Sequence, residues 1–175
     1  AGGRWTAQKK RTIRESRVQG TLLLSETLAS LSRPPSVFIS ASAIGFYGNR
    51  GDELLNETSR PGKDFLANVC VDWEAATISA TEKGIRTTHT RFGIILDERE
   101  GALAKMLPPF RAGIGGKIGG GNQWMSWIAL EDVVAALKFL LADGTIQGPV
   151  NVVAPNPVTN AEFTTTLGRV LSRPT

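Results

Sequence analysis

The sequence is poor in residues on which several classes of site depend. Its 175 residues include one cysteine, Cys70, so no internal disulfide can form and a reducing compartment is expected. Its one histidine, His89, stands among threonines on a predicted strand. A lone histidine in that setting is more often structural than a ligand, and we expect no metal site.

Long apolar runs are missing as well. The longest, residues 133–137 and 139–142, are separated by Lys138 and are far too short to cross a bilayer. The basic segment 4–17 lacks the apolar stretch of a signal peptide. We therefore expect a cytoplasmic protein with no membrane partner.

Positive charge is present but unevenly placed. The net charge is +4, and residues 1–35 carry seven Lys or Arg residues against two Glu residues. A basic segment can contact nucleic acid, but the only aromatic residue there is Trp5 and no binding motif accompanies it. A solvated helix face explains the charge better, so we expect no nucleic-acid partner.

Apolar periodicity predicts alternating helices and strands in an α/β domain. Hydrophobic content of 41% and charged content of 21% are those of an ordinary globular protein. Gly20 lies inside the first helix, and close packing against a neighbouring strand would explain it. The predicted helices span residues 7–31, 64–83, 130–142 and 159–171, and the predicted strands span 36–42, 85–96, 124–128 and 148–154.

Residues 36–48, SVFISASAIGFYG, are the most informative stretch. Its apolar start is typical of a strand buried on both faces of a parallel sheet. Its end carries Ser40, Ser42 and two glycines, and ligands of open α/β sheets bind beyond the carboxyl ends of the strands. A strand that simply runs into a Gly/Ser turn remains the alternative.

Residues 99–122 are rich in glycine, and GGKIGGG at 115–121 invites comparison with a phosphate-binding loop. The comparison fails because Arg111 and Ile118 occupy the positions that need glycine and a hydroxyl residue. The glycines indicate a flexible flap that covers a ligand. Arg111 and Lys117 then pair with a substrate phosphate or carboxylate, or they are solvated surface residues.

Four segments in order resemble motifs of the extended short-chain dehydrogenase/reductase superfamily. SRVQGT at 16–21 is similar to its NVxGT helix motif, SASAIGFYG at 40–48 to SSSxxxYG, SWIALEDV at 126–133 to DFIHVDDV, and GPVNVVA at 148–154 to GxxYNxG. The chain more narrowly resembles an NAD-dependent epimerase/dehydratase-like subfamily, related to sugar-nucleotide epimerases, whose substrate is unknown. The fold implied is a Rossmann-like doubly wound parallel sheet.

The resemblance implies a single domain over residues 1–175 that is only part of the superfamily's fold. No GxxGxxG turn followed by a helix is present, so the chain looks like a fragment that lacks the N-terminal part and a small C-terminal region. Substrate-side segments are expected at about 99–128 and 150–175. The resemblance also implies a homodimer through helices 7–31 and 64–83.

The catalytic residues implied by the resemblance are mostly replaced. The superfamily uses a Tyr as acid/base, a Lys that lowers its pKa, an orienting Ser and a supporting Asn. By position, Ser42 is the serine, whereas Leu66, Cys70 and Arg17 stand where Tyr, Lys and Asn are expected. Tyr47, the only tyrosine, is a second candidate proton donor, although its position matches a structural Tyr.

The cofactor implied is NADP or NAD, bound weakly without the glycine-rich turn. It would lie beside Ser40, Ala41 and the backbone of Arg91, Phe92, Gly93 and Ile94. Gly93 would allow close approach of that backbone, or it marks a β-bulge. The sequence therefore predicts an NAD(P)-dependent oxidoreductase or epimerase-like protein acting on a nucleotide-sugar or small polyol. The alternative is a dinucleotide-binding redox sensor or scaffold without turnover.

Overall fold

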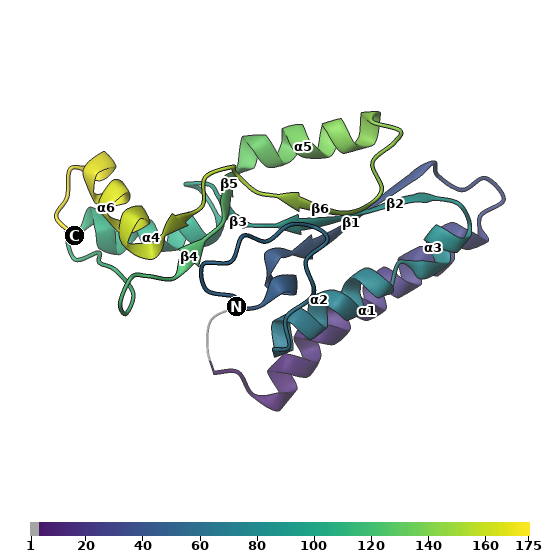
Figure 1. Cartoon of the computed structure of the whole chain (residues 1–175), viewed down its shortest axis with the longest axis horizontal. Coiled ribbons are helices and arrows are strands. Elements are labelled where there is room, and N and C mark those ends of the chain that lie inside the picture. The colour runs from purple at the N-terminus through teal and green to yellow at the C-terminus, as the bar shows by residue number, and fades with distance from the viewer. Residues whose placement is uncertain (1–3) are drawn as a thin grey trace. The chain divides into compact units, whose positions relative to one another are not determined.

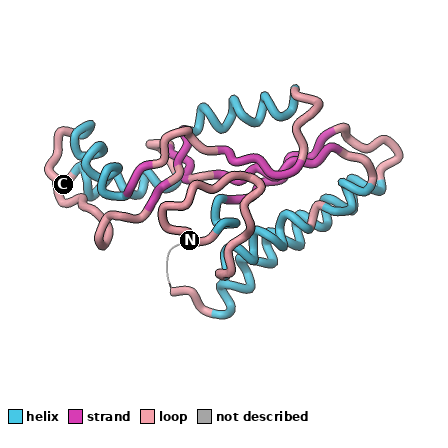
Figure 2. The backbone as a smooth tube through the Cα atoms, viewed as in Figure 1, coloured by secondary structure: helices cyan, strands magenta, loops and turns pink. Residues whose placement is uncertain are grey.

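The computed structural model describes residues 4–175, which fold as two compact units (Figures 1 and 2). Of the described residues, the first unit comprises 4–49, 55–91 and 140–150, and the second comprises 50–54, 92–139 and 151–175. The two expected substrate-side segments, 99–128 and 150–175, fall in the second unit apart from Val150. That the whole chain acts as one domain stays a prediction.

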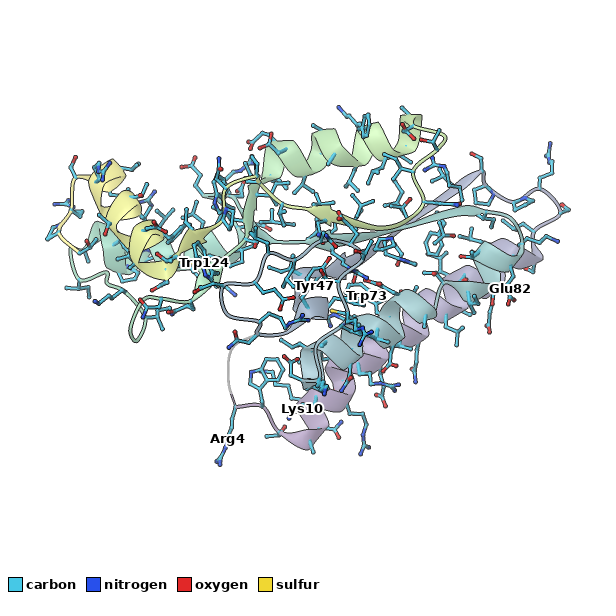
Figure 3. All side chains as sticks on the ribbon, in the orientation of Figure 1. Arg4, Lys10, Tyr47, Trp73, Glu82 and Trp124 are labelled. Carbon is cyan, nitrogen blue, oxygen red and sulfur yellow. The ribbon has the colours of Figure 1, made fainter. Side chains whose placement is uncertain are left out.

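The helices of the first unit begin at the side-chain caps that the sequence indicates. Thr6 caps α1 (Ala7–Ser30) by accepting from the Lys9 N–H at 3.2 Å, and Asp64 caps α2 (Phe65–Ala75) by accepting from Ala67 at 2.9 Å. Trp73 on α2, labelled in Figure 3, donates its indole N–H to Thr21 of α1 at 2.9 Å. The expected packing of Gly20 is wrong, since no atom lies within 4 Å of a Cβ built there.

The predicted helix 64–83 is divided into α2 and α3 (Ile78–Glu82). Thr77 lies at the junction, and its hydroxyl donates to the Glu74 carbonyl at 2.8 Å. A hydroxyl that bonds a nearby carbonyl competes with regular helix geometry. The apolar periodicity continues through this break, which is why it predicts one helix.

A three-stranded sheet in the order β1–β2–β6 is formed by β1 (Val37–Ala43), β2 (Arg86–Phe92) and β6 (Gly148–Val152). Bonds from the Arg86 N–H to the Ser36 carbonyl and from the Thr90 hydroxyl to the Ser40 carbonyl, both 3.2 Å, show that β1 and β2 run parallel. The α/β class with a parallel sheet is confirmed. The expectation that β1 is buried on both faces is wrong, because Ala41 is exposed while Phe38, Ser40 and Ser42 are buried.

Two apolar clusters stabilise the first unit. Phe38, Ala80 and Ile85 pack together with the half-buried Leu28. Phe46 and Tyr47, from the short 3-10 helix η1 (Ile44–Tyr47), pack with Cys70 of α2. The second cluster therefore joins the carboxyl end of β1 to α2.

The predicted strand 85–96 breaks at Gly93, which lies in the second unit. Beyond it, β3 (Ile94–Leu96) pairs in parallel with β5 (Trp127–Ala129), with Ile94 opposite Trp127. A Cβ built on Gly93 would lie 2.6 Å from the Ser126 carbonyl oxygen. The close approach expected at Gly93 is thus made by the protein's own backbone.

Three helices and a second strand pair complete this part of the chain. They are α4 (Gly101–Arg111), α5 (Leu130–Ala142), α6 (Asn160–Leu171), and the antiparallel pair β4 (Trp124–Met125) and β7 (Val158–Thr159). Thr159 and Glu162 form a capping box at the start of α6. Among the described residues, no helix has the length and apolar character needed to cross a membrane.

Candidate functional site

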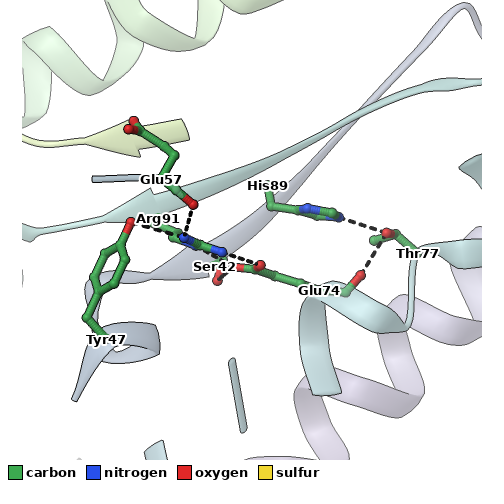
Figure 4. A network of polar contacts seen from close by, with 7 residues as sticks. All are labelled: Ser42, Tyr47, Glu57, Glu74, Thr77, His89 and Arg91. Carbon is green, nitrogen blue, oxygen red and sulfur yellow. Dashed lines mark hydrogen bonds and ion pairs between the residues drawn. The ribbon is translucent and has the colours of Figure 1, made fainter. Parts of the chain in front are cut away.

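A buried ion pair between Arg91 and Glu74 is the centre of the candidate site in the first unit (Figure 4). Arg91 is on β2 and Glu74 is on α2, and their side chains are 3% and 12% exposed. The guanidinium donates twice to the carboxylate, from Nε to Oε1 and from Nη2 to Oε2, each at 2.8 Å. This two-point geometry fixes both side chains more firmly than a single contact would.

Both predicted catalytic residues bond to this ion pair. Ser42 donates its hydroxyl proton to Glu74 Oε1 at 2.6 Å, and the Tyr47 hydroxyl accepts from Arg91 Nη1 at 3.0 Å. The Phe46 ring lies over the guanidinium with its centroid 3.4 Å from the Arg91 Cζ atom. We call Ser42, Tyr47, Glu74 and Arg91 the Arg91 network.

The network keeps both charges of the ion pair. Burial alone would raise the pKa of Glu74, but hydrogen bonds from Arg91 and Ser42 hold that pKa below its ordinary value. Burial opposes the charge of Arg91 too, yet bonds to Glu74 and Tyr47 raise the pKa of Arg91. Ser42 therefore faces an ionised carboxylate, and Tyr47 faces a cation.

The residues at the expected Tyr and Lys positions supply no such charges. Leu66 is a partly exposed residue on α2, and Cys70 is buried one turn further along. Burial, and then the charge of Glu74, raise the pKa of the Cys70 thiol. A neutral thiol is neither a cation nor an activated nucleophile, and Cys70 is a buried residue of α2.

Glu74 is the functional residue that sequence reasoning missed. The useful signal was in the strand pattern, because alternation places His89 and Arg91 on one face of β2. A carboxylate on the helix packed against that face could therefore have been predicted as the partner of Arg91.

His89 extends the same set of contacts toward the junction of α2 and α3. Its Nε2 atom lies 2.8 Å from the Thr77 hydroxyl oxygen. The single proton of that hydroxyl is already donated to the Glu74 carbonyl. Nε2 must therefore carry the proton in this bond, which fixes the tautomer of the neutral imidazole.

The single histidine makes this assignment directly measurable. Burial lowers the pKa of His89, the charge of Glu74 opposes that effect, and Arg91 adds to it. We expect nitrogen NMR shifts to show the Nε2–H tautomer and a titration midpoint below 6.5. Since the unfolded chain binds this proton more readily, stability falls as the pH drops from about 6.5 toward the folded pKa. An Nδ1–H tautomer, or a Thr77→Val variant with an unchanged spectrum, would contradict the assignment.

The residues predicted to contact a cofactor are distributed over both units. In the first unit, the Ser40 side chain lies on the buried face of β1, whereas Ala41 is exposed on the other face. The Arg91 side chain is committed to Glu74, so only its backbone is available. Among the described residues, no side chain covers the exposed Ala41, so its methyl group and the Ser40 backbone are accessible at this end of β1.

The second unit holds the remaining predicted contacts. Phe92, Gly93 and Ile94 lie where β2 ends and β3 begins, and the Ile94 N–H donates to the Ser126 carbonyl at 2.8 Å. Arg111 ends α4 and Lys117 lies in the following loop, both exposed.

Arg17, at the position where the superfamily has its supporting Asn, lies on α1 in the first unit. Its guanidinium carbon Cζ is 5.4 Å from the centroid of the Trp73 ring.

An open surface depression of about 370 Å³ lies beyond the carboxyl ends of β3 and β5 in the second unit. A hydrogen bond from Arg99 lowers the pKa of Asp97, in the wall of this depression, to about 2. Asp97 and Arg99 form an ion pair with each other at 2.9 Å. The residues that line the depression are Leu96, Asp97, Glu98, Arg99, Leu103 and Glu131.

Sequence comparison places these features in a family context. The model of the NAD dependent epimerase/dehydratase family matches residues 1–153. Epimerase family protein Mb2239 of Mycobacterium bovis is 45% identical over 172 residues, which cover 98% of this chain and 56% of that protein. Epimerase family protein YfhF of Bacillus subtilis is 38% identical and is covered to 57%. The chain thus spans little more than half the length of these curated relatives.

Solved structures agree with the sequence relatives. The human epimerase family protein SDR39U1 with NADPH has a TM-score of 0.91 at 32% identity, covering 98% of this chain and 58% of that one. A nucleoside-diphosphate sugar epimerase from Corynebacterium glutamicum has a TM-score of 0.83 at 44% identity, covering 98% and 38%. UDP-glucose 4-epimerase from Thermotoga maritima, at 18% identity and a TM-score of 0.77, shows the shared Rossmann-like fold alone.

Proposed function

The chain belongs to the NAD dependent epimerase/dehydratase family, and from this premise we propose that it contributes to an NAD(P)-dependent oxidoreductase or epimerase. The substrate is a hydroxylated compound, either a nucleotide-linked sugar or a small polyol. The observation that carries the proposal is the Arg91 network, which gathers two hydroxyl groups and an ion pair at the end of β1. The reducing compartment suggested by the buried Cys70 supports a cytoplasmic location.

The cofactor proposed is NADP or NAD. The human relative with 32% identity was solved with NADPH, which supports pyridine nucleotide binding here. In the first unit, Ala41 and the backbone of Ser40 and Arg91 would contact the nicotinamide side. When bound, the cofactor supplies or accepts a hydride, and weak binding is expected for a chain without the glycine-rich turn.

Ser42 and Tyr47 are the proposed catalytic hydroxyls. Ser42 directs its proton to Glu74, so it would meet a substrate hydroxyl as a hydrogen-bond acceptor. Tyr47 would give or take a proton at the substrate oxygen, with Arg91 in the place of the missing lysine. The Arg91 guanidinium would then hold the Tyr47 hydroxyl in place beside that oxygen.

The test combines cofactor binding with turnover by the whole protein. NADPH fluorescence should report binding, and a panel of polyols should reveal hydride transfer. Ser42→Ala should lower turnover by about 100-fold or more while NADPH binding persists, and Tyr47→Phe should behave alike. Ser30→Ala is the matched control, because Ser30 is exposed and bonds only within its own helix. Turnover that survives Ser42→Ala would refute the catalytic assignment.

A second candidate function, without turnover, is favoured by the identities of Leu66 and Cys70. Neither supplies the acid or the cation of the superfamily, which supports a dinucleotide-binding sensor or scaffold without turnover. NADPH binding together with no hydride transfer from any polyol would favour this reading.

We also propose a homodimer through α1, α2 and α3. These helices pack together in the first unit and expose apolar side chains, including Leu23, which is 66% exposed. Such surface is unusual for a monomer and typical of an interface. Sedimentation at increasing concentration should show a dimer, and a monomer throughout would contradict the proposal. The other exposed apolar residues on these helices are Leu22, Leu24, Leu66, Val71 and Ile78.

A further inference from the structure

The side chains at the centre of the candidate site are covered in this structure. Tyr47 is 4% exposed and Arg91 is 3% exposed, so a substrate oxygen reaches the Tyr47 hydroxyl only if the chain around it moves. Within the first unit, part of this cover comes from the segment that leads from η1 to α2, which forms neither helix nor strand. The contacts of that segment show how the cover is held.

The backbone carbonyl of Glu57 occupies a position on the network that a substrate oxygen would need. It accepts from Arg91 Nη1 at 3.4 Å, and the same nitrogen donates to the Tyr47 hydroxyl at 3.0 Å (Figure 4). Both N–H groups of Nη1 are therefore engaged. A bond of 3.4 Å is long, so an oxygen that binds the guanidinium at about 2.9 Å would replace the carbonyl with a gain in bond strength.

Residues 55–59 carry this carbonyl as one braced turn, which we call the strap. The Asn56 side-chain oxygen accepts from the Thr58 N–H at 3.0 Å, and the Asn56 N–H donates to the Ser59 hydroxyl oxygen at 3.0 Å. These bonds lie within the strap, so they survive if the strap moves as a whole. The half-buried Leu55 side chain fastens it by packing against the apolar cluster that joins η1 to α2.

The two sides of the strap are held differently. Beyond it, the Gly62 N–H donates to the Phe46 carbonyl at 2.9 Å, and a Cβ built on Gly62 would lie 2.7 Å from the Tyr47 carbonyl oxygen. This side is thus packed closely on the backbone of η1. Before the strap, the Leu54 side chain is 94% exposed and gives the chain no packing support. The geometry allows the strap to turn about Gly62 once Leu55 leaves the cluster.

We propose that the strap is an autoinhibitory cover of the Arg91 network and that substrate displaces it. In the closed form, the Glu57 carbonyl holds the place of a substrate oxygen on Arg91 Nη1. In the open form, this N–H group and the neighbouring Tyr47 hydroxyl meet that oxygen. The inference rests on the proposed function, because it takes Tyr47 as a group that meets substrate. The open form is the minor one, so the apparent substrate affinity is reduced in proportion to its population.

The first test measures opening by the whole protein without any ligand. Cys70 is the only cysteine and belongs to the cluster on which Leu55 packs, so its rate of alkylation by iodoacetamide reports the open form. Leu55→Ala should raise that rate about tenfold, because the closed form loses apolar contact. Leu54→Ala is the matched control, since it makes the same chemical change at a 94% exposed side chain and should leave the rate unchanged.

Urea separates opening of the strap from unfolding of the whole protein. A local opening exposes little surface, so the faster alkylation of Leu55→Ala should persist with little dependence on urea below the unfolding transition. A rate that rises steeply with urea in that range would assign the alkylation to global unfolding and overturn the proposal. Equal rates in Leu55→Ala and Leu54→Ala would also overturn it.

The second test measures turnover of the polyol panel by the same variants with NADP. Leu55→Ala should lower KM about tenfold and leave kcat unchanged, because saturating substrate opens the strap in either protein. Leu54→Ala should match the wild type in both constants. Faster alkylation of Leu55→Ala with an unchanged KM would overturn the autoinhibitory role. Absence of turnover in every variant would refute the proposed function, while faster alkylation of Leu55→Ala would still support the opening of the strap.

Discussion

Glu74→Ala is expected to lower the free energy of unfolding by about 3–5 kcal/mol. The substitution leaves the Arg91 guanidinium buried without its carboxylate, and an uncompensated buried charge carries a penalty of this size. It also removes the acceptor of the Ser42 hydroxyl. Urea unfolding followed by circular dichroism measures the loss.

Asp72→Ala is the matched control because it removes an ion pair from the same helix. Arg14 and Asp72 are also 2.8 Å apart, but their side chains are 52% and 36% exposed. Water screens such a pair, so we expect a loss below about 1 kcal/mol. Equal losses in the two variants would show that burial does not set the strength of the Arg91 contact. Replacing both Arg91 and Glu74 by methionine should recover part of the stability, since no charge is then left buried.

The same carboxylate gives the stability a defined dependence on pH. The folded pKa of Glu74 lies below its ordinary value of 4.5, so the unfolded chain takes up the proton first. Its contribution is complete above the unfolded pKa and is lost as the pH falls through the folded pKa. Glu74→Gln should flatten the acid limb of the stability curve in that window.

Local sequence signals predicted the positions of the elements well because their causes are local. Thr6, Asp64 and Thr159 each cap the helix that follows, through bonds spanning three residues. Sequence missed the break at Thr77 and offered a β-bulge at Gly93 only as an alternative, and both residues have partners further away. Thr77 contacts His89 of β2, and Gly93 lies against Ser126.

In the candidate site too, sequence predicted the local features but not the contacts between residues far apart in the chain. The strand-end motif identified Ser42 and Tyr47, and the structure brings both to one ion pair. Arg91 was expected to contribute its backbone, whereas its side chain is the centre of the network. Sequence spacing cannot reveal which carboxylate a buried arginine will meet, because that depends on how α2 packs against β2.

Gly93→Ala is expected to lower the free energy of unfolding by about 1–3 kcal/mol. The added methyl would lie 2.6 Å from the Ser126 carbonyl oxygen and 3.0 Å from its carbonyl carbon, and backbone atoms cannot rotate away as a side chain can. Gly20→Ala is the control, since its Cβ meets nothing and alanine favours a helix interior by up to about 1 kcal/mol. Urea unfolding and NADPH titration of the same variants separate the two roles considered for Gly93. Lost stability with retained NADPH affinity assigns the glycine to the contact between β3 and Ser126. Retained stability with lost NADPH affinity would instead assign it to the cofactor.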